Sequence, residues 1–230
     1  MSLKLNEPQV YKEFYGKNID QMPKLIAEGR TPLSVNGLMN RRLEVLKSDN
    51  AELKAAWIDN YFDTGDGCSR NTNGNLKVVY DAKKLRELNS ESKLPNGDIL
   101  LGDSDYRKLE GPEFKKAVLD KYAGRSLTKQ EVLHNPLWLA LAREDKSLLR
   151  EYASKIFSEA KTRFSYNENM GLYLPSVQEK PIMRSWFVWG LDDGSDANGD
   201  YDLGVAGSRL VGVTPGAQVI AKNLEGKVKR

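Results

Sequence analysis

The sequence predicts an α+β fold in which a mostly helical core carries a small antiparallel sheet and hairpin elements. Several segments repeat apolar residues at helical spacing, and a few short extended segments lie between turn-forming residues. The chain shows no regular βαβ alternation, which argues against a doubly wound sheet. A hydrophobic fraction of 40% and a charged fraction of 29% over 230 residues are typical of a globular protein.

We expect one globular domain over residues 1–221, followed by a flexible basic tail over residues 222–230. A chain of this length can bury a core of its own. Within the domain, the expected order is a helical region 34–62, a small sheet element 70–102, a second helical region 111–165, and an extended or hairpin region 171–214.

The first helical region divides into two helices near Ser48. Apolar residues within Leu38–Leu46 recur at helical spacing. Asp49 and Glu52 then predict a capping box, in which each side chain accepts a hydrogen bond from a backbone amide at the start of a new helix.

The segment that follows contains the main turn signals. Residues 63–75 are turn-forming almost throughout, and Asn73-Gly74 is typical of a two-residue hairpin turn. Leu76–Tyr80 and Ile99–Leu101 are predicted strands, with a short helix over Ala82–Leu88 between them.

The second helical region is expected to start at Gly111-Pro112, because proline is favoured in the first turn of a helix. Thr128 and Glu131 predict another capping box. The clearest helix spans residues 146–164, where apolar residues recur at i, i+3, i+4 and i+7 and Asp145 can cap the first turn.

The C-terminal region mixes extended and ambiguous segments. Gly171–Leu174 is predicted to be extended. Pro181–Leu191 fits either a helix opened by its proline or a buried strand, and its length favours the helix. Tyr201–Val205 and Arg209–Val213 are predicted to pair as a hairpin, because glycine lies in the connection between them.

The formal charge of +3 is unevenly distributed along the chain. Residues 222–230 carry a net charge of +3, so the rest of the chain is neutral. Five aspartates and no basic residue lie between Asp192 and Asp202. Such a field steers charged partners without identifying them. A nucleic-acid partner remains an alternative that would use the tail and the surface around Arg184.

The single cysteine and the single histidine exclude several kinds of site. Cys68 has no second cysteine for an intramolecular disulfide, and with His134 alone the common structural zinc cages cannot form within one chain. The two could form a nucleophile and base pair, but we interpret His134 as structural and Cys68 as inert. No signal peptide or apolar span of about 20 residues is visible, so we expect a cytoplasmic protein without a membrane partner.

One acidic segment alternates oxygen-bearing side chains, a pattern that can wrap ligands around Ca²⁺ or Mg²⁺. Its members are Asp196, Asn198, Asp200 and Asp202. The segment resembles the opening of an EF-hand or dockerin-type loop, which implies a calcium site. It departs from that pattern at Tyr201, where the turn needs glycine, and at Gly207, where a bidentate glutamate belongs. A solvated turn is therefore the favoured interpretation.

Asp63 and Asp66 form a second acidic pair in a glycine-rich segment. If this pair met the acidic segment, four or more carboxylates could hold two metal ions for phosphoryl chemistry. Separately, Trp186 and Trp189 lie near Arg184 and could form an exposed binding surface for a base or a sugar. A place in the core is the favoured interpretation of these tryptophans.

The residues leave the function open and identify no catalytic residue. The favoured interpretation is a non-catalytic intracellular protein that acts through binding. The first alternative is a divalent-metal-dependent enzyme that uses the clustered aspartates on a phosphate or nucleic-acid substrate. The second is a nucleic-acid-binding accessory protein. The sequence does not indicate an oligomeric state or a firm cofactor.

Overall fold

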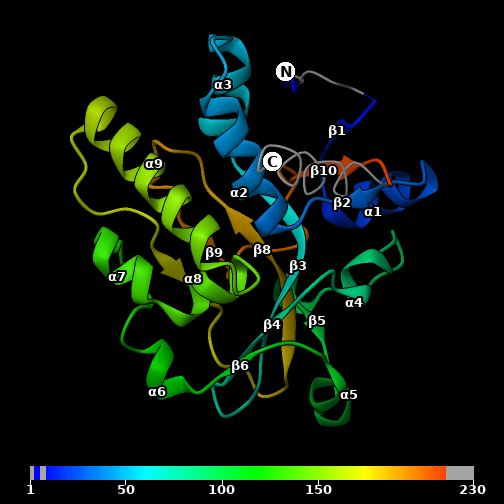
Figure 1. Ribbon diagram of the computed structural model, residues 1–230. Coiled ribbons are helices and arrows are strands. Elements are labelled where there is room, and N and C mark those ends of the chain that lie inside the picture. The colour runs from blue at the N-terminus through cyan, green and yellow to red at the C-terminus, as the bar shows by residue number, and fades with distance from the viewer. Residues whose placement is uncertain (1–2, 6–8, 216–230) are drawn as a thin grey trace, which may run out of the picture.

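A large mixed sheet organises the molecule, as the computed structural model in Figure 1 shows. The structure describes residues 3–5 and 9–215. The main path of the sheet joins six strands in the order β1-β10-β3-β8-β9-β7. These strands are β1 (Tyr11–Tyr15), β10 (Arg209–Val213), β3 (Phe62–Arg70), β8 (Ile182–Val188), β9 (Ala197–Asn198) and β7 (Leu172–Tyr173). Four short strands pair beside this path: β2 (Thr31–Pro32), β4 (Leu76–Val79), β5 (Ile99–Leu100) and β6 (Glu113–Phe114).

The sheet combines both strand directions and joins distant parts of the chain. β10 pairs antiparallel with β1 and parallel with β3, and β3 pairs antiparallel with β8. The first and the last strand of the described chain therefore lie side by side (Figure 1). The predicted helical core with a small antiparallel sheet is wrong, because the described chain contains a mixed sheet of ten strands.

β3 explains much of this error, since residues 63–75 were predicted to be turns. Residues 62–69 are all buried, and several polar side chains among them are hydrogen-bonded, either within the sheet or to neighbouring segments. Thr64 Oγ1 donates to the carbonyl of Trp186 at 2.8 Å, and Ser69 Oγ donates to the carbonyl of Ile182 at 2.8 Å. Gly67 allows close packing, because a Cβ atom there would lie 3.1 Å from the Cβ of Ala82. Satisfied hydrogen bonds thus let a polar, glycine-rich segment form a buried strand.

β8 corrects the helix favoured for Pro181–Leu191. Every residue of Ile182–Val188 is buried. The strand lies inside the sheet, with β3 paired along one edge and β5 and β9 along the other. A strand buried on both faces has no alternation of apolar and polar residues, so its period of two is not visible in the sequence. The predicted hairpin is also wrong: Arg209–Val213 is β10, but its partners are β1, β2 and β3, and Tyr201–Val205 forms no strand.

Helices cover the sheet on both sides (Figure 1). The longer helices are α1 (Asn18–Ala27), α2 (Val35–Leu46), α3 (Ala51–Ile58) and α9 (Lys146–Phe164). The shorter ones are α4 (Lys83–Arg86), α5 (Asp103–Lys108), α6 (Lys116–Leu119), α7 (Lys129–His134), α8 (Pro136–Leu141) and the 3-10 turn η1 (Pro95–Gly97). The helix α4 lies within the short helix predicted over Ala82–Leu88.

The local helix signals have mixed outcomes. Helix α9 has the predicted bounds, and its cap Asp145 accepts from the amide of Leu148 at 2.9 Å. The capping box at α7 is confirmed. At α3 the cap is Asn50 instead of Asp49. The helix expected from residue 111 is instead the strand β6 followed by the short α6.

Two apolar clusters fill the space between the sheet and the helices. The larger one contains Trp57, Trp138 and Trp186, all fully buried, and Ile156 of α9. The smaller one gathers residues of α1, α4 and β10. Within the described chain no helix is both long and apolar enough to cross a bilayer. The predicted basic tail, residues 222–230, lies outside the described residues.

Candidate functional site

The four residues proposed as metal ligands each bind a different part of the chain. Asp196 Oδ1 accepts from the amide of Gly171 at 2.5 Å, and Asn198 Oδ1 accepts from the amide of Asp200 at 2.7 Å. Asp200 pairs with Arg184 at 2.9 Å, and Asp202 accepts from Gly204 at 2.5 Å. Across residues 3–5 and 9–215, no group of three or more His, Cys, Asp or Glu residues could hold a metal ion. The described residues therefore do not support the Ca²⁺ or Mg²⁺ site that was weighed against a solvated turn.

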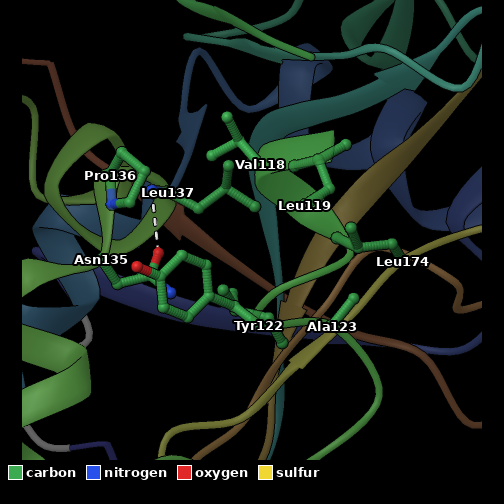
Figure 2. Close-up of a pocket in the computed structure, with 9 residues that line it drawn as sticks. Val118, Leu119, Tyr122, Ala123, Asn135, Pro136, Leu137 and Leu174 are labelled. Carbon is green, nitrogen blue, oxygen red and sulfur yellow. Dashed lines mark hydrogen bonds between the residues drawn. The ribbon is translucent and has the colours of Figure 1, made fainter. Parts of the chain in front are cut away.

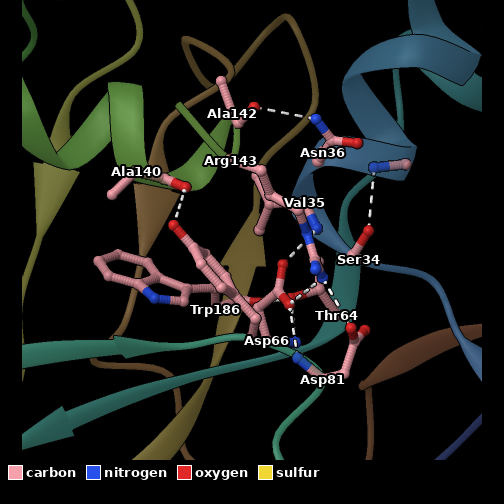
Figure 3. Close-up of polar contacts among 12 residues, drawn as sticks. Ser34, Val35, Asn36, Thr64, Asp66, Asp81, Ala140, Ala142, Arg143 and Trp186 are labelled. Carbon is pink, nitrogen blue, oxygen red and sulfur yellow. Dashed lines mark hydrogen bonds and ion pairs between the residues drawn. The ribbon is translucent and has the colours of Figure 1, made fainter. Parts of the chain in front are cut away.

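Asp63 and Asp66 do not join a metal cluster either. Asp63 accepts from Asn18 Nδ2 at 3.0 Å and from the amide of Arg209 at 2.7 Å. Asp66 lies in a separate network, where it accepts from the amide of Val35 at 2.8 Å (Figure 3).

Figure 3 also shows the other partners of Asp66. Its Oδ1 accepts from the amide of Asp81 at 3.0 Å and from Arg143 at 3.2 Å. Burial raises the pKa of both Asp63 and Asp66. The clustered carboxylates required by the metal-dependent enzyme alternative are therefore not formed, and that interpretation is wrong.

The candidate nucleophile and base lie in different surroundings. Cys68 is fully buried in β3, and burial raises the pKa of its thiol. His134 is exposed at the end of α7, with Nδ1 2.8 Å from the carbonyl of Gln130. A buried thiol with a raised pKa holds little of the reactive thiolate.

The three residues of the predicted binding surface separate in the structure. Because side chains alternate along a strand, Trp186 and Trp189 point to opposite faces of the sheet. Trp186 is fully buried in the larger cluster. Arg184 is buried beside Asp98 and Asp200. Trp189 is half-buried and lies in a different group of aromatic rings.

That group, the aromatic platform, lies partly at the surface of the described chain. Its members are Tyr15, Tyr61, Phe187, Trp189 and Tyr201. The Phe187 ring is stacked with Tyr201 (centroids 4.3 Å apart, planes at 21°) and with Tyr61 (5.2 Å, 25°). Trp189 lies edge-on to Phe187 at 4.7 Å and to Tyr201 at 6.1 Å. Phe187 is fully buried, whereas Tyr61, Trp189 and Tyr201 are half-buried and Tyr15 is 53% exposed.

Arg209 contacts two rings of the platform through its guanidinium group. Its guanidinium lies 5.3 Å from the Tyr15 ring centroid and 4.8 Å from that of Tyr61. It pairs with Glu13 at 2.8 Å and donates to Asn60 Oδ1 at 2.6 Å. Arg209 therefore orders two tyrosine rings while its charge is balanced by a neighbouring carboxylate.

Polar groups border the rings. The Tyr61 hydroxyl donates to the carbonyl of Gly207 at 2.8 Å. Burial raises the pKa of Tyr61 and of Tyr201, and for Tyr201 the carboxylates of Asp63 and Asp202 add to the shift. Both phenols therefore stay protonated at neutral pH, and the Tyr61 proton is donated to Gly207.

Negative charge flanks the platform on two sides. Asp200 and Asp202 lie on either side of Tyr201 in the chain, and Asp192 and Asp193 follow Trp189 closely. Asp192, Asp193 and Asp200 are exposed. The surface thus combines half-buried aromatic rings with acidic residues close to them in the sequence, of which Asp200 is paired with Arg184.

Sequence reasoning found only Trp189 among the platform residues. The others come from β1, from the residue before β3, from β8 and from the segment after β9, which meet only through the sheet order. The one local signal is the spacing of Phe187 and Trp189, two residues apart on the same face of an extended segment.

An apolar hollow elsewhere offers little room (Figure 2). Val118, Leu119, Tyr122 and Leu137 contribute to its lining. Its volume of about 10 Å³ is room for about one water molecule. This hollow is too small for a ligand larger than water, and we place the candidate site at the aromatic platform on the geometry of its rings.

Comparison with known proteins identifies the fold. No family model matches the sequence, and no curated protein matches it. The chain is similar to a solved structure from work on how the C-type lectin fold accommodates massive sequence variation in Nanoarchaeota. The two chains are 17% identical, the match covers 91% of this chain and 100% of the other, and the TM-score is 0.67. The mixed sheet of this chain is therefore a C-type lectin fold.

Proposed function

We propose that the protein is a non-catalytic binding protein that recognises a protein partner through the aromatic platform. The observation that carries this proposal is the ordered group of tyrosine and tryptophan rings beside a buried arginine. Tyr, Trp and Arg are the residues most enriched at protein interface hot spots, because they bring large contact areas at a low entropy cost. We propose the cytoplasm as its location, since a single cysteine gives no sign of an oxidising compartment.

The negative charge near the platform favours a partner with a positively charged surface. The exposed aspartates beside Trp189 and Tyr201 create a negative rim around the rings. A partner surface with lysine or arginine around an apolar centre would match both features. The likeness to a chain whose fold accommodates massive sequence variation supports recognition by surface side chains on a constant scaffold.

Selection of disulfide-cyclised peptides from a random phage library tests this function. We expect the enriched peptides to carry Arg or Lys together with an apolar residue, and to weaken at high salt. Trp189→Ala should raise their dissociation constant about 30-fold, the effect of losing a hot spot of about 2 kcal/mol. The matched control is Tyr166→Ala, which removes another exposed ring, stacked on Phe164 at 5.4 Å and outside the platform.

Two outcomes would overturn the proposal. Peptides that bind the Trp189→Ala and wild-type proteins equally would show that the platform is not the binding site. A signal on a glycan array that is lost in Trp189→Ala, in the absence of platform-dependent peptides, would replace the protein partner by a carbohydrate.

A further inference from the structure

Arg184 joins three segments that are far apart in the sequence. Its Nε donates to Asp98 Oδ1 at 2.5 Å, and its Nη2 donates to the carbonyl of Asn96 at 2.9 Å, both in the turn around η1. Its Nη1 donates to the carboxylate of Asp200 at 2.9 Å and also to the backbone carbonyl of the same residue. Asp200 directly precedes Tyr201, so these bonds hold the chain next to the platform ring.

A second contact ties the same two segments together. Gly97 has φ +78°, and a Cβ atom there would lie 2.1 Å from Cγ of Asp202. The amide of Leu203 donates to the carbonyl of Gly97 at 3.2 Å. The turn around η1 therefore contacts the segment 200–203 next to Tyr201. Only glycine at position 97 allows the Asp202 side chain to come this close to the backbone of the turn.

We propose that Arg184 is a positioning residue, which holds Tyr201 on the Phe187 ring and so preorganises the platform. The Arg184 side chain is 9% exposed and that of Asp98 is 2% exposed, so this contact is protected from solvent. Tyr201 lies outside any strand, and its stacking at 4.3 Å on Phe187 depends on where the segment that carries it is fixed. Fixing a binding side chain before association lowers the entropy lost on binding.

The position of the Tyr201 ring can be measured without a ligand. Tyrosine ring protons of the free protein are recorded by NMR, and the Tyr201 signals are assigned from the spectrum of Tyr201→Phe. We expect upfield shifts from the stacked Phe187 ring in the wild-type protein. These shifts should be lost in Arg184→Met/Asp98→Asn, in which the second change avoids leaving a buried unpaired carboxylate.

The matched control replaces another arginine that pairs with a buried aspartate. Arg143→Met/Asp66→Asn removes the 3.2 Å pair shown in Figure 3 without touching residues 196–203, and should leave the Tyr201 shifts unchanged. If the Arg184 double variant does not fold, Asp200→Ala serves instead, since that side chain is 48% exposed, and it should reduce the Tyr201 shifts partially. Wild-type Tyr201 shifts in a folded Arg184 double variant, or in Asp200→Ala, would overturn the proposal.

The effect on binding rests on the proposed function, whereas the effect on the ring does not. For a peptide that depends on Trp189, we expect the Arg184 double variant to raise the dissociation constant at least 10-fold and the Arg143 control to change it less than 2-fold. If no peptide depends on the platform, the proposed function fails and the ring shifts still decide the role of Arg184. A loss of shifts without any loss of peptide affinity would show that Arg184 does not preorganise binding.

Discussion

Asp196 should make the stability of the protein depend on pH in a direction opposite to that of a salt-bridged carboxylate. The side chain is 7% exposed, and burial raises its pKa from 3.8 to about 6. Between these values the folded chain holds a proton that the unfolded chain has released, so the free energy of unfolding falls as the pH rises. A pKa difference of about two units, at about 1.4 kcal/mol for each unit, gives a loss of about 2–3 kcal/mol between pH 4 and pH 7.

Asp196→Asn isolates this contribution, because the amide oxygen can still accept from Gly171 while the side chain has no charge to bury. We expect the variant to gain about 2–3 kcal/mol over the wild-type protein between pH 4 and pH 7.5, measured by urea denaturation at both values. Glu91→Gln removes an exposed carboxylate and serves as the control, with a change under about 0.5 kcal/mol. A difference between Asp196→Asn and wild type that stays constant across this range would refute the reasoning.

Two core substitutions test the packing. Ile156→Ala in α9 should lower the free energy of unfolding by about 2–5 kcal/mol, because it leaves a cavity in the core. Glu159→Ala on the same helix should lower it by less than about 0.5 kcal/mol. Equal urea midpoints for the two variants would contradict the assignment of Ile156 to the buried face of α9. Gly199→Ala should cost about 1–3 kcal/mol, because the new Cβ would lie 2.3 Å from Sγ of Cys68. Adding Cys68→Ala removes the Sγ contact but keeps the Cβ atom of residue 68, which would lie 2.8 Å from the new Cβ, so it should recover only part of that loss. No recovery in the same urea assay would place the strain elsewhere.

Local signals in the sequence predicted local structure well. The bounds of α9 and the capping box at Thr128 follow from side chains within four residues of each other, so a short window contains the whole signal.

Strands buried on both faces could not be predicted from a short window of sequence. In β3, the aspartate and glycine residues are typical of turns, yet Asp63 and Asp66 form hydrogen bonds to amides from other elements. In β8, continuous burial hides the strand period, so Trp186 and Trp189 were read as neighbours on one helical face. The tertiary partners of both strands decide their conformation, and those partners are remote in the sequence.

The candidate site could not be predicted from the sequence for the same reason, because its residues are remote from one another in the chain. Tyr15, Tyr61 and Tyr201 come together because β1, β10, β3 and β8 are neighbours in the sheet. No spacing in the sequence reports that order. The acidic segment was correctly noticed as unusual, but its aspartates accept hydrogen bonds from the chain and flank Tyr201 instead of converging on a metal ion.

The most direct test of the account is an NMR measurement of contacts between a selected peptide and the protein. Intermolecular NOEs should connect the peptide to the ring protons of Trp189 and Tyr201, which are half-buried and border the negative rim. We expect these NOEs at low salt and their loss in 0.5 M salt, because salt screens the attraction to the negative rim. NOEs that instead place the peptide at the apolar hollow around Val118 and Tyr122, with none to Trp189 or Tyr201, would contradict it.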